Sequence, residues 1–194
     1  MAGESGSGIV LETARLRLRR LAPDDLDRLV DLDADPEVMR YITWGVPTSR
    51  ERYAREILPR WFALHEISTV LGYWAAETRA EAVFVGMFHL RPDRFEPEEL
   101  ELGYRLARVA WGRGLATEGG RAVVRHGFER AAATRICART LADNVRSLCV
   151  MQNCGLRYER SFVYPEDLVA GRTESERAAV KYSITRQAWE AMRA

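Results

Sequence analysis

Hydrophobic and polar positions alternate near the start of the chain, and this pattern predicts a strand. Between Leu11 and Leu21, leucines at positions 16 and 18 alternate with arginines at 17 and 19, and a period of two is typical of a half-buried strand. Pro23-Asp24-Asp25 then begins a helix with leucine and valine on one side, and Asp35-Pro36-Glu37 begins a shorter helical turn.

Glycine and proline interrupt the pattern once before the main run of strands. Gly45-Val46-Pro47 breaks the chain, Thr48 or Ser49 can cap a helix to about Ile57, and Pro59 is expected to end or kink that helix. The strands expected after it are 69–77, 82–90, one through 100–102, 135–141, 156–164 and 177–185; the expected helices are 117–132, 144–153 and 186–193.

No internal repeat or linker divides the 194 residues, of which 47% are hydrophobic. This length and composition suit one domain with an ordinary core. We expect a flexible tail over residues 1–10 and a single domain over residues 11–194. The small residues of Met1–Gly8 lack the basic and apolar regions of a signal peptide, and no apolar run reaches the roughly 20 residues that a membrane span requires.

Charge and cysteine usage narrow the function classes. The formal net charge is +1, with one lysine, Lys181, and 28 arginines, so nothing in the overall balance favours binding to nucleic acid or to a membrane. The cysteines are odd in number and form no Cys-x-x-Cys, which disfavours a disulfide framework or a zinc site. We expect a cytoplasmic protein without a metal. The cysteines are Cys137, Cys149 and Cys154.

The most informative segment is a glycine turn between a predicted strand and a predicted helix. Gly112-Arg113-Gly114 opens directly into the helix at Thr117-Glu118, and successive backbone N–H groups beside a helix N-terminus can bind an anion such as a pyrophosphate. A tight connection without a ligand is the alternative. No Gly-Lys-Ser/Thr follows, which argues against a P-loop, and the third glycine of a dinucleotide fingerprint is replaced by Thr117.

The chain around this turn resembles the GNAT acetyltransferase superfamily, in the branch of the ribosomal-protein N-terminal (alanine/serine) acetyltransferases. The Gln/Arg-x-x-Gly-x-Gly/Ala motif of that family falls on 111–116, with Trp111 in its first position, as in the branch variant Trp-Gly-x-Gly-x-Ala-Thr-Glu. The other marks are Thr13–Arg19, the Asn-x-x-Ser that begins at Asn144, and 181–185. The resemblance implies an α/β GNAT fold: a mixed, mostly antiparallel sheet of about seven strands, flanked by helices, whose two central parallel strands splay apart.

The resemblance also implies where acetyl-CoA binds. The pantetheine arm would pair with the backbone of Tyr104, Arg105 and Leu106, next to a phosphate-binding cradle at the glycine turn. Asn144 would contact CoA through its side chain, and Ser147 would lie near the sulfur as an acid or a water anchor; the alternative is that both simply begin a helix. The cradle would consist of Gly112, Arg113, Gly114, Leu115, Ala116 and Thr117.

Glu101 is the candidate general base, because it lies on the strand that leads into the cradle. Acetyl transfer needs a deprotonated amine and a proton for the leaving thiolate. Glu99 and Glu101 share one face of the strand, and the alternative is that both are solvated. Glu101 could also act through a water. Tyr158 and Tyr164 are alternative acids but are expected to be sheet residues, and no role is assigned to His65, His89 or His126.

These features predict an acetyl-CoA-dependent N-acetyltransferase that acts on a primary amine, either a protein N-terminus or a small molecule, by direct attack in a ternary complex. Tyr41 and Trp44 could line the acceptor pocket, or they could be core residues. A CoA-binding sensor with little transferase activity is the alternative function. A nucleic-acid-binding function is disfavoured by the near-neutral charge, and a homodimer is possible.

Overall fold

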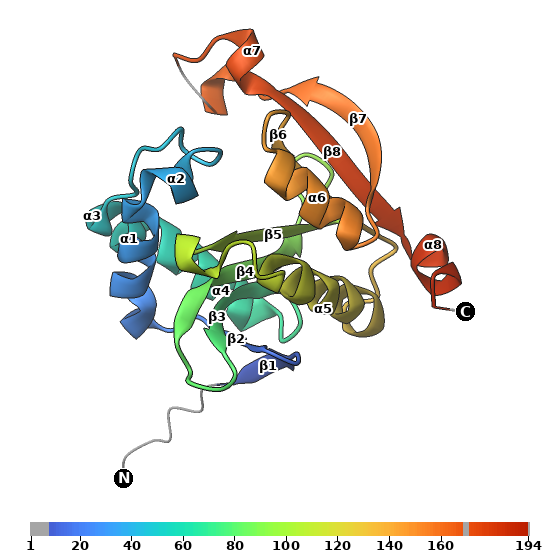
Figure 1. The fold of residues 1–194 in the computed structure, drawn as a ribbon, viewed down its shortest axis with the longest axis horizontal. Coiled ribbons are helices and arrows are strands. Elements are labelled where there is room, and N and C mark those ends of the chain that lie inside the picture. The colour runs from blue at the N-terminus through green and yellow to red at the C-terminus, as the bar shows by residue number, and fades with distance from the viewer. Residues whose placement is uncertain (1–7, 169–170, 194) are drawn as a thin grey trace.

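One mixed sheet runs through the protein, and helices cover both of its faces (Figure 1). The computed structural model describes residues 8–168 and 171–193. Within these residues the sheet has eight strands in the order β1-β2-β3-β4-β5-β6-β8-β7. The strands are β1 (Ile9–Glu12), β2 (Leu16–Arg20), β3 (Gly72–Thr78), β4 (Phe84–Pro92), β5 (Leu100–Leu106), β6 (Arg135–Leu141), β7 (Arg157–Val163) and β8 (Ala178–Thr185). The helices are α1 (Leu26–Ala34), α2 (Pro36–Met39), α3 (Arg50–Arg52), α4 (Leu58–Ile67), α5 (Leu115–Arg130), α6 (Val145–Asn153), α7 (Glu174–Arg177) and α8 (Arg186–Ala191).

The single strand expected between Leu11 and Leu21 is instead a hairpin, β1–β2. Thr13 makes the turn, because its Oγ1 accepts a hydrogen bond from the Leu16 N–H at 2.8 Å and its own N–H donates to the Leu16 carbonyl at 2.9 Å. The added strand brings the sheet to eight strands rather than about seven. The tail boundary expected after residue 10 falls inside β1, which begins at Ile9; residues 1–7 of that tail lie outside the described residues.

The helix expected to end near Ile57 continues to Ile67. A π-helical segment, Tyr53–Ile57, joins α3 to α4, and the Leu58 N–H bonds to the carbonyl of Tyr53, five residues earlier. Proline in a regular helix clashes with the carbonyl four residues before it, and the wider π turn changes the backbone at that point. Pro59 therefore lies in the first turn of α4, where proline is well tolerated.

The sheet opens at its centre, as the resemblance implied. β5 and β6 are parallel neighbours, but they pair only at Leu100–Ile136 and Glu101–Cys137. Beyond Glu101, β5 stays paired with β4 through Leu106, while β6 stays paired with β8 through Leu141. The two strands therefore diverge, and the facing edges of both carry backbone groups with no strand partner.

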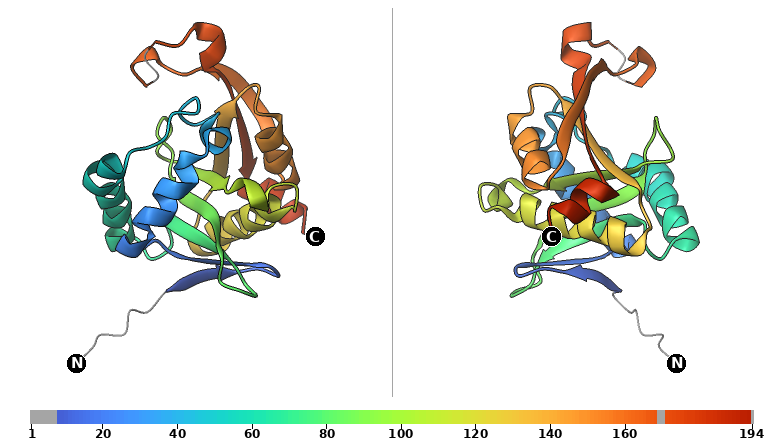
Figure 2. Two further views of the ribbon diagram at one scale, coloured as in Figure 1. Left: turned by 60° about the vertical axis from the view of Figure 1, so that its left-hand side comes forward. Right: turned by 90° about the vertical axis from the view of Figure 1, so that its right-hand side faces the viewer.

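The two faces of β5 look into different cores. Leu102 and Leu106 pack with Phe88 beneath α5, whereas Arg105 reaches Asp33 of α1 on the other face. A Cβ at Gly119 of α5 would collide with the ring of Phe88, so this glycine lets the helix lie close to the sheet. Because side chains alternate along a strand, Glu101 faces α1 with Arg105. Figure 2 shows β7 and β8 extending past the other strands as an arm that carries α7.

Candidate active site

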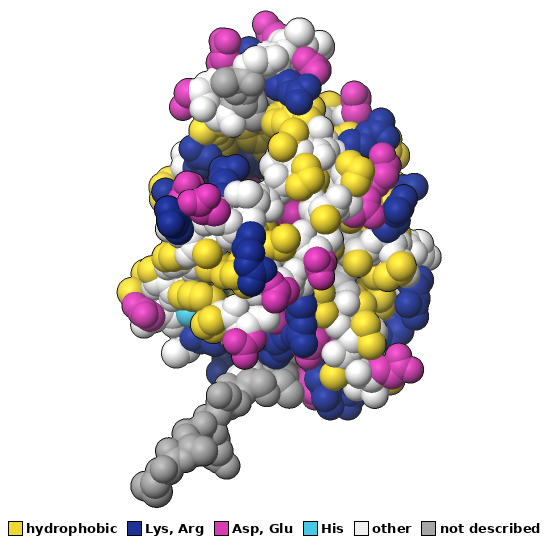
Figure 3. All heavy atoms as spheres, turned by 90° about the vertical axis from the view of Figure 1, so that its left-hand side faces the viewer, with side chains coloured by type: hydrophobic (Ala, Val, Ile, Leu, Met, Phe, Trp, Pro, Cys, Tyr) yellow, Lys and Arg dark blue, Asp and Glu magenta, His cyan; other side chains and the backbone are white. Residues whose placement is uncertain are grey.

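A cavity of about 1240 Å³ occupies the opening between β5 and β6. Figure 3 shows the molecule hollowed on the side of α1–α4, below the projecting arm, with Lys and Arg side chains near the hollow. Two predicted site residues, Arg113 and Trp44, do not line the cavity. The predicted site residues that line it are Tyr41, Glu101, Tyr104, Arg105, Leu106, Gly112, Gly114, Leu115, Ala116, Thr117, Asn144 and Ser147.

The glycine turn lies at one end of this cavity and opens into the N-terminus of α5. Gly112 and Gly114 have φ angles of +70° and +75°, which side chains rarely adopt. A Cβ at Gly112 would meet nothing within 4 Å, so the space beside it is open. Gly114 is the N-cap and provides no side-chain cap, which leaves the first N–H groups of the helix free for an anion.

Glu101 is enclosed at the other end, contrary to the solvated alternative. Its side chain is 15% exposed and forms an ion pair with Arg91, its cross-strand neighbour on β4. Burial raises the pKa of Glu101, and the charge of Arg91 partly opposes this rise. Glu99 belongs to a separate cluster, where it pairs with Lys181 at 2.8 Å.

Tyr104 and Ser147 meet on the opposite face of the sheet. The Tyr104 hydroxyl lies 2.9 Å from Ser147 Oγ, so a hydrogen bond joins β5 to α6 across the opening. Burial raises the pKa of Tyr104, although the Ser147 hydrogen bond opposes this. Tyr104 was expected to contribute its backbone, and the structure adds a hydroxyl that is protonated near neutral pH.

Asn144 is the N-cap of α6, as its alternative interpretation expected. Its Oδ1 accepts from the Ser147 N–H at 3.3 Å, and its Nδ2 donates to Thr140 Oγ1 at 2.9 Å. The side chain therefore holds the first turn of α6 against the end of β6. It lines the cavity while both of its polar groups have protein partners.

Arg105 and the two aromatic candidates occupy three different environments. The guanidinium of Arg105 is buried against Asp33, at 3.0 Å, and the Tyr53 hydroxyl, at 2.7 Å, so its side chain ties β5 to the α1–α4 layer. Tyr41 lines the cavity. Trp44 has a φ angle of +54° and lies under the guanidinium of Arg172, 5.1 Å from the ring centroid, away from the cavity.

Several cavity residues escaped the sequence analysis. His89 lies across from Gly103, and a Cβ at Gly103 would collide with the imidazole. His89 Nε2 is buried and has no hydrogen-bond partner among the described residues, and burial, with Arg91 and Arg105 nearby, lowers the pKa of this histidine well below its usual value. The register between β4 and β5 would have placed Arg91 and His89 near Glu101, but the sequence alone does not give that register.

Tyr164, expected to be a sheet residue, lies just after β7 and lines the cavity. Burial and the charge of Glu101 raise its pKa to about 12. On the same side, Tyr73 stacks on Trp61 with the ring centroids 4.3 Å apart. Tyr158 is 57% exposed and lies outside the cavity.

In residues 8–168 and 171–193, no three His, Cys, Asp or Glu side chains gather in a way that could hold a metal ion. No helix of the described chain is long and apolar enough to cross a membrane.

The comparisons with known proteins agree with this geometry. A model of the acetyltransferase (GNAT) domain matches residues 15–157. The FsC-acetyl coenzyme A-N(2)-transacetylase of Aspergillus fumigatus is 33% identical over 187 residues, which cover 92% of this chain and 77% of the relative.

Solved structures share the fold at lower identity. The ribosomal alpha-N-protein acetyltransferase RimL in complex with coenzyme A has a TM-score of 0.73 and 16% identity over 93% of this chain and 99% of its own. Spermidine N-acetyltransferase of Vibrio cholerae in complex with CoA and spermine has a TM-score of 0.71 and 16% identity over 90% and 98%. The chain belongs to the GNAT acetyltransferase family and is an acetyl-CoA-dependent acyltransferase.

Proposed function

We propose that this acyltransferase acetylates a primary amine by direct attack of the amine in a ternary complex. One observation carries the proposal: Glu101 and the Tyr104–Ser147 pair reach the same cavity from opposite faces of β5. A proton acceptor thus lies on the α1 side and a proton donor on the α5 side. Relatives named as transacetylase, alpha-N-protein acetyltransferase and spermidine N-acetyltransferase support an amine acceptor.

The residues present fit acetyl-CoA, which supplies an acyl group activated as a thioester. The free edge of β5 from Leu102 to Leu106 can pair with the amides of a pantetheine arm as an added strand would. The open space at Gly112 and the free N–H groups at the start of α5 suit a pyrophosphate. Asn144 contributes by holding α6 in place.

Glu101 takes the proton that the ammonium must lose before nitrogen can attack. Burial raises the pKa of this carboxylate and makes it a stronger base than a solvated glutamate, while the charge of Arg91 opposes the rise. The imidazole of His89, whose pKa lies well below its usual value, adds an uncharged polar group beside this carboxylate. Tyr73 and Trp61 form an aromatic wall on this side, against which the carbon chain of the acceptor can pack.

Ser147 and Tyr104 provide the proton for the leaving sulfur. As the new C–N bond forms and the C–S bond breaks, the electron pair of that bond remains on sulfur. Ser147 Oγ can donate its proton there and regain one from the Tyr104 hydroxyl 2.9 Å away. The ammonium loses two protons in all. Glu101 takes the first before attack, and the second, released from nitrogen once the C–N bond has formed, passes through the solvent of the open cavity to restore the Tyr104 hydroxyl, so that CoA leaves as a thiol and the Tyr104–Ser147 pair is unchanged.

Loss of the hydroxyl pair should slow turnover. Tyr104→Phe and Ser147→Ala are each expected to lower kcat about tenfold, because a thiolate needs less acid help than an alkoxide. The double variant should lose little more than either single variant, because both changes break the same hydrogen bond. The measurement is steady-state kcat at saturating acetyl-CoA.

The chain offers a matched control for that measurement. Tyr158 and Ser161 form an exposed pair with 3.0 Å between their oxygens, so Tyr158→Phe and Ser161→Ala should leave kcat unchanged. If the loss of kcat in the Tyr104→Phe/Ser147→Ala double variant equalled the product of the two single losses, the two residues would act separately. That result would contradict the transfer of a proton from Tyr104 through Ser147.

The acceptor class is tested with a panel of amines. Release of CoA, with mass spectrometry of the products, would be measured for N-terminal peptides, polyamines and amino-acid amines. The slight preference for a protein N-terminus comes from the branch resemblance, and turnover of small amines alone would reject it. Tight CoA binding with no turnover on any amine would contradict the proposed function and favour the sensor.

A further inference from the structure

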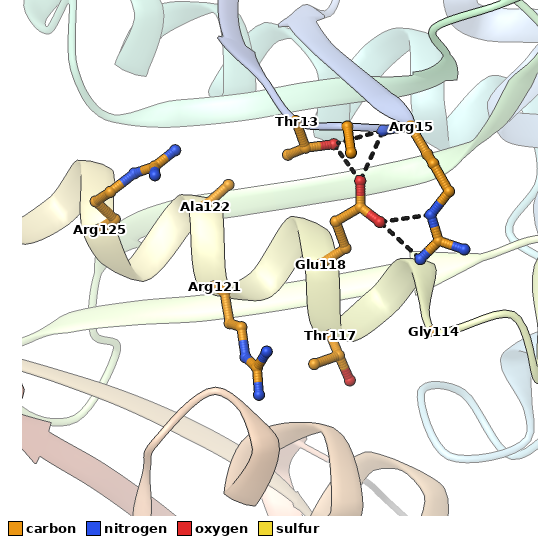
Figure 4. Close-up of a pocket in the computed structure, with 9 residues that line it drawn as sticks. Thr13, Arg15, Gly114, Thr117, Glu118, Arg121, Ala122 and Arg125 are labelled. Atoms are coloured by element: carbon orange, nitrogen blue, oxygen red, sulfur yellow. Dashed lines mark hydrogen bonds and ion pairs between the residues drawn. The ribbon is translucent and has the colours of Figure 1, made fainter. Parts of the chain in front are cut away.

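The tip of the β1–β2 hairpin holds the first turn of α5, although about a hundred positions separate them in the chain. Figure 4 shows the carboxylate of Glu118 enclosed by this tip. One oxygen accepts from Thr13 Oγ1 at 2.6 Å and from the Arg15 N–H at 2.8 Å. The other oxygen accepts from Arg15 Nε at 2.6 Å. Four contacts therefore converge on one side chain, since Arg15 Nη2 also lies 2.6 Å from it.

The same arginine reaches the glycine turn itself. Arg15 Nη1 donates to the carbonyl of Arg113 at 2.8 Å. In a trans peptide the C=O and the following N–H point in opposite directions. Because the Arg113 carbonyl is held toward the hairpin, the Gly114 N–H is directed away from it. Gly114 separates the pocket at the hairpin from the large cavity and lines both, so this N–H is directed to the cavity side.

The negative charge of Glu118 has to be balanced if a phosphate is to bind at the glycine turn. Glu118 lies in the first turn of α5, where an unpaired carboxylate would repel a phosphate group. Arg15 neutralises it and keeps its two oxygens turned toward the hairpin. Burial alone would raise the pKa of Glu118, but the hydrogen bonds from Thr13 and Arg15 outweigh this and lower it, so the carboxylate stays ionised.

We propose that Thr13, Arg15 and Glu118 form a clamp that positions the Gly112–Gly114 turn for the pyrophosphate of acetyl-CoA. These are positioning residues that act through the Arg113–Gly114 peptide. The clamp contributes little to overall stability, because Arg15 is 51% exposed and ion pairs at that exposure are weak. It also explains why the chain carries both Thr13-Ala14-Arg15 and Thr117-Glu118: they are the two halves of one contact.

The CoA affinity of Glu118→Gln distinguishes the clamp from a simple repulsion between the Glu118 charge and the phosphates. If Glu118 were only a negative charge near the phosphates, its removal would tighten CoA binding. The clamp predicts weaker binding, by about tenfold in Kd, because an amide cannot accept from Thr13 and the Arg15 guanidinium as the carboxylate does. The measurement is calorimetry with CoA and the full chain, without an acceptor.

Arg15→Met should weaken CoA to a similar extent, and Arg17→Met is its matched control. Arg17 lies on the same hairpin and pairs with Glu12 at 2.8 Å, with both side chains about 40% exposed, but it does not touch the turn. Both variants should keep the melting temperature of the wild type. The KM for acetyl-CoA should rise in Arg15→Met with kcat nearly unchanged, and neither should change in Arg17→Met.

Acetyl-pantetheine, which lacks the pyrophosphate, distinguishes a loss of pyrophosphate binding from general damage to the active site. Glu118→Gln and Arg15→Met should use it as well as the wild type does. Wild-type or tighter CoA binding by Glu118→Gln would overturn the proposal, as would equal losses with acetyl-pantetheine and acetyl-CoA. If Arg15→Met failed to fold, Thr13→Val, which removes the hydrogen bond to Glu118 together with the one from the Leu16 N–H, should still raise the Kd about threefold, and an unchanged Kd would overturn the proposal.

Discussion

Glu101→Gln lowers kcat/KM for a simple alkylamine by about 10²–10⁴-fold, the usual range for loss of a general base. Glutamine has nearly the same shape and can still accept a hydrogen bond from Arg91, so the cavity keeps its structure. It cannot take a proton from the ammonium. The loss should be smaller for a peptide N-terminus, because an α-amine has a pKa of about 7.7–8.0 against about 10.4 for an alkylamine and is partly deprotonated already.

The pH dependence of kcat/KM provides a second test of Glu101 as the base. Burial raises the pKa of Glu101 above its usual value, with Arg91 opposing. A protonated carboxyl cannot act as a base, so the wild type loses activity as the pH falls through that raised pKa. The variant lacks this limb, and the ratio of wild-type to variant kcat/KM should therefore shrink toward low pH. Glu98→Gln, at an exposed position on the β4–β5 loop, should behave as the wild type. Identical pH profiles for wild type and Glu101→Gln would remove Glu101 from the mechanism.

Apart from α7, which was not predicted, the strands and helices from Gly72 onward were predicted with small boundary errors because their periodicity is local. β6, for example, covers 135–141 in both. The hairpin at Thr13 was missed because its turn contains neither glycine nor proline and is held by Glu118. The continuation of the helix past Pro59 depends on a π turn that no residue pattern announces.

The cofactor end of the site was more predictable than the acceptor end for the same physical reason. The cradle is one contiguous segment, and its glycines are visible in the sequence. The surroundings of Glu101 come from two strands and a loop, because Arg91 and His89 lie on β4, Tyr73 on β3 and Tyr164 after β7. Their positions depend on strand register, and in a sheet a slip of one residue would turn every side chain to the other face.

Lys181→Met should be strongly destabilising although it lies away from the cavity, at about 3–5 kcal/mol in the free energy of unfolding. Lys181 is the lone lysine of the chain, and its side chain is fully buried. Its ammonium contacts Glu96 and lies 2.8 Å from Glu99 and 3.0 Å from Glu159. Methionine fills a similar volume, so the expected cost comes from three carboxylates that lose the buried ammonium between them and keep only their arginine partners, Arg135, Arg139 and Arg160.

The pKa shifts of Lys181 and its carboxylate partners predict the pH at which Lys181→Met loses most stability. Burial alone would lower the pKa of Lys181, but its carboxylate partners outweigh burial and raise it. The hydrogen bond from Lys181 holds the pKa of Glu96 below its usual 4.5. A carboxylate with a lowered folded pKa stabilises the fold above its unfolded pKa, and this stabilisation is lost as pH falls through the folded pKa. The deficit of Lys181→Met should therefore be largest near neutral pH and shrink below pH 4.5.

Urea unfolding at pH 7 and at pH 4 measures the loss of stability in Lys181→Met and its dependence on pH. Arg55→Met is the control, because its ion pair with Glu51 is more than 70% exposed on both sides and its loss should cost within about 0.5 kcal/mol. Adding Glu99→Gln to Lys181→Met should recover part of the stability, because it removes one of the three neighbouring carboxylates, and the remaining cation partner of Glu99, Arg135, lies 3.4 Å away. If the double variant were less stable than Lys181→Met, Glu99 would stabilise the fold independently of Lys181, and repulsion among the carboxylates could not explain the loss.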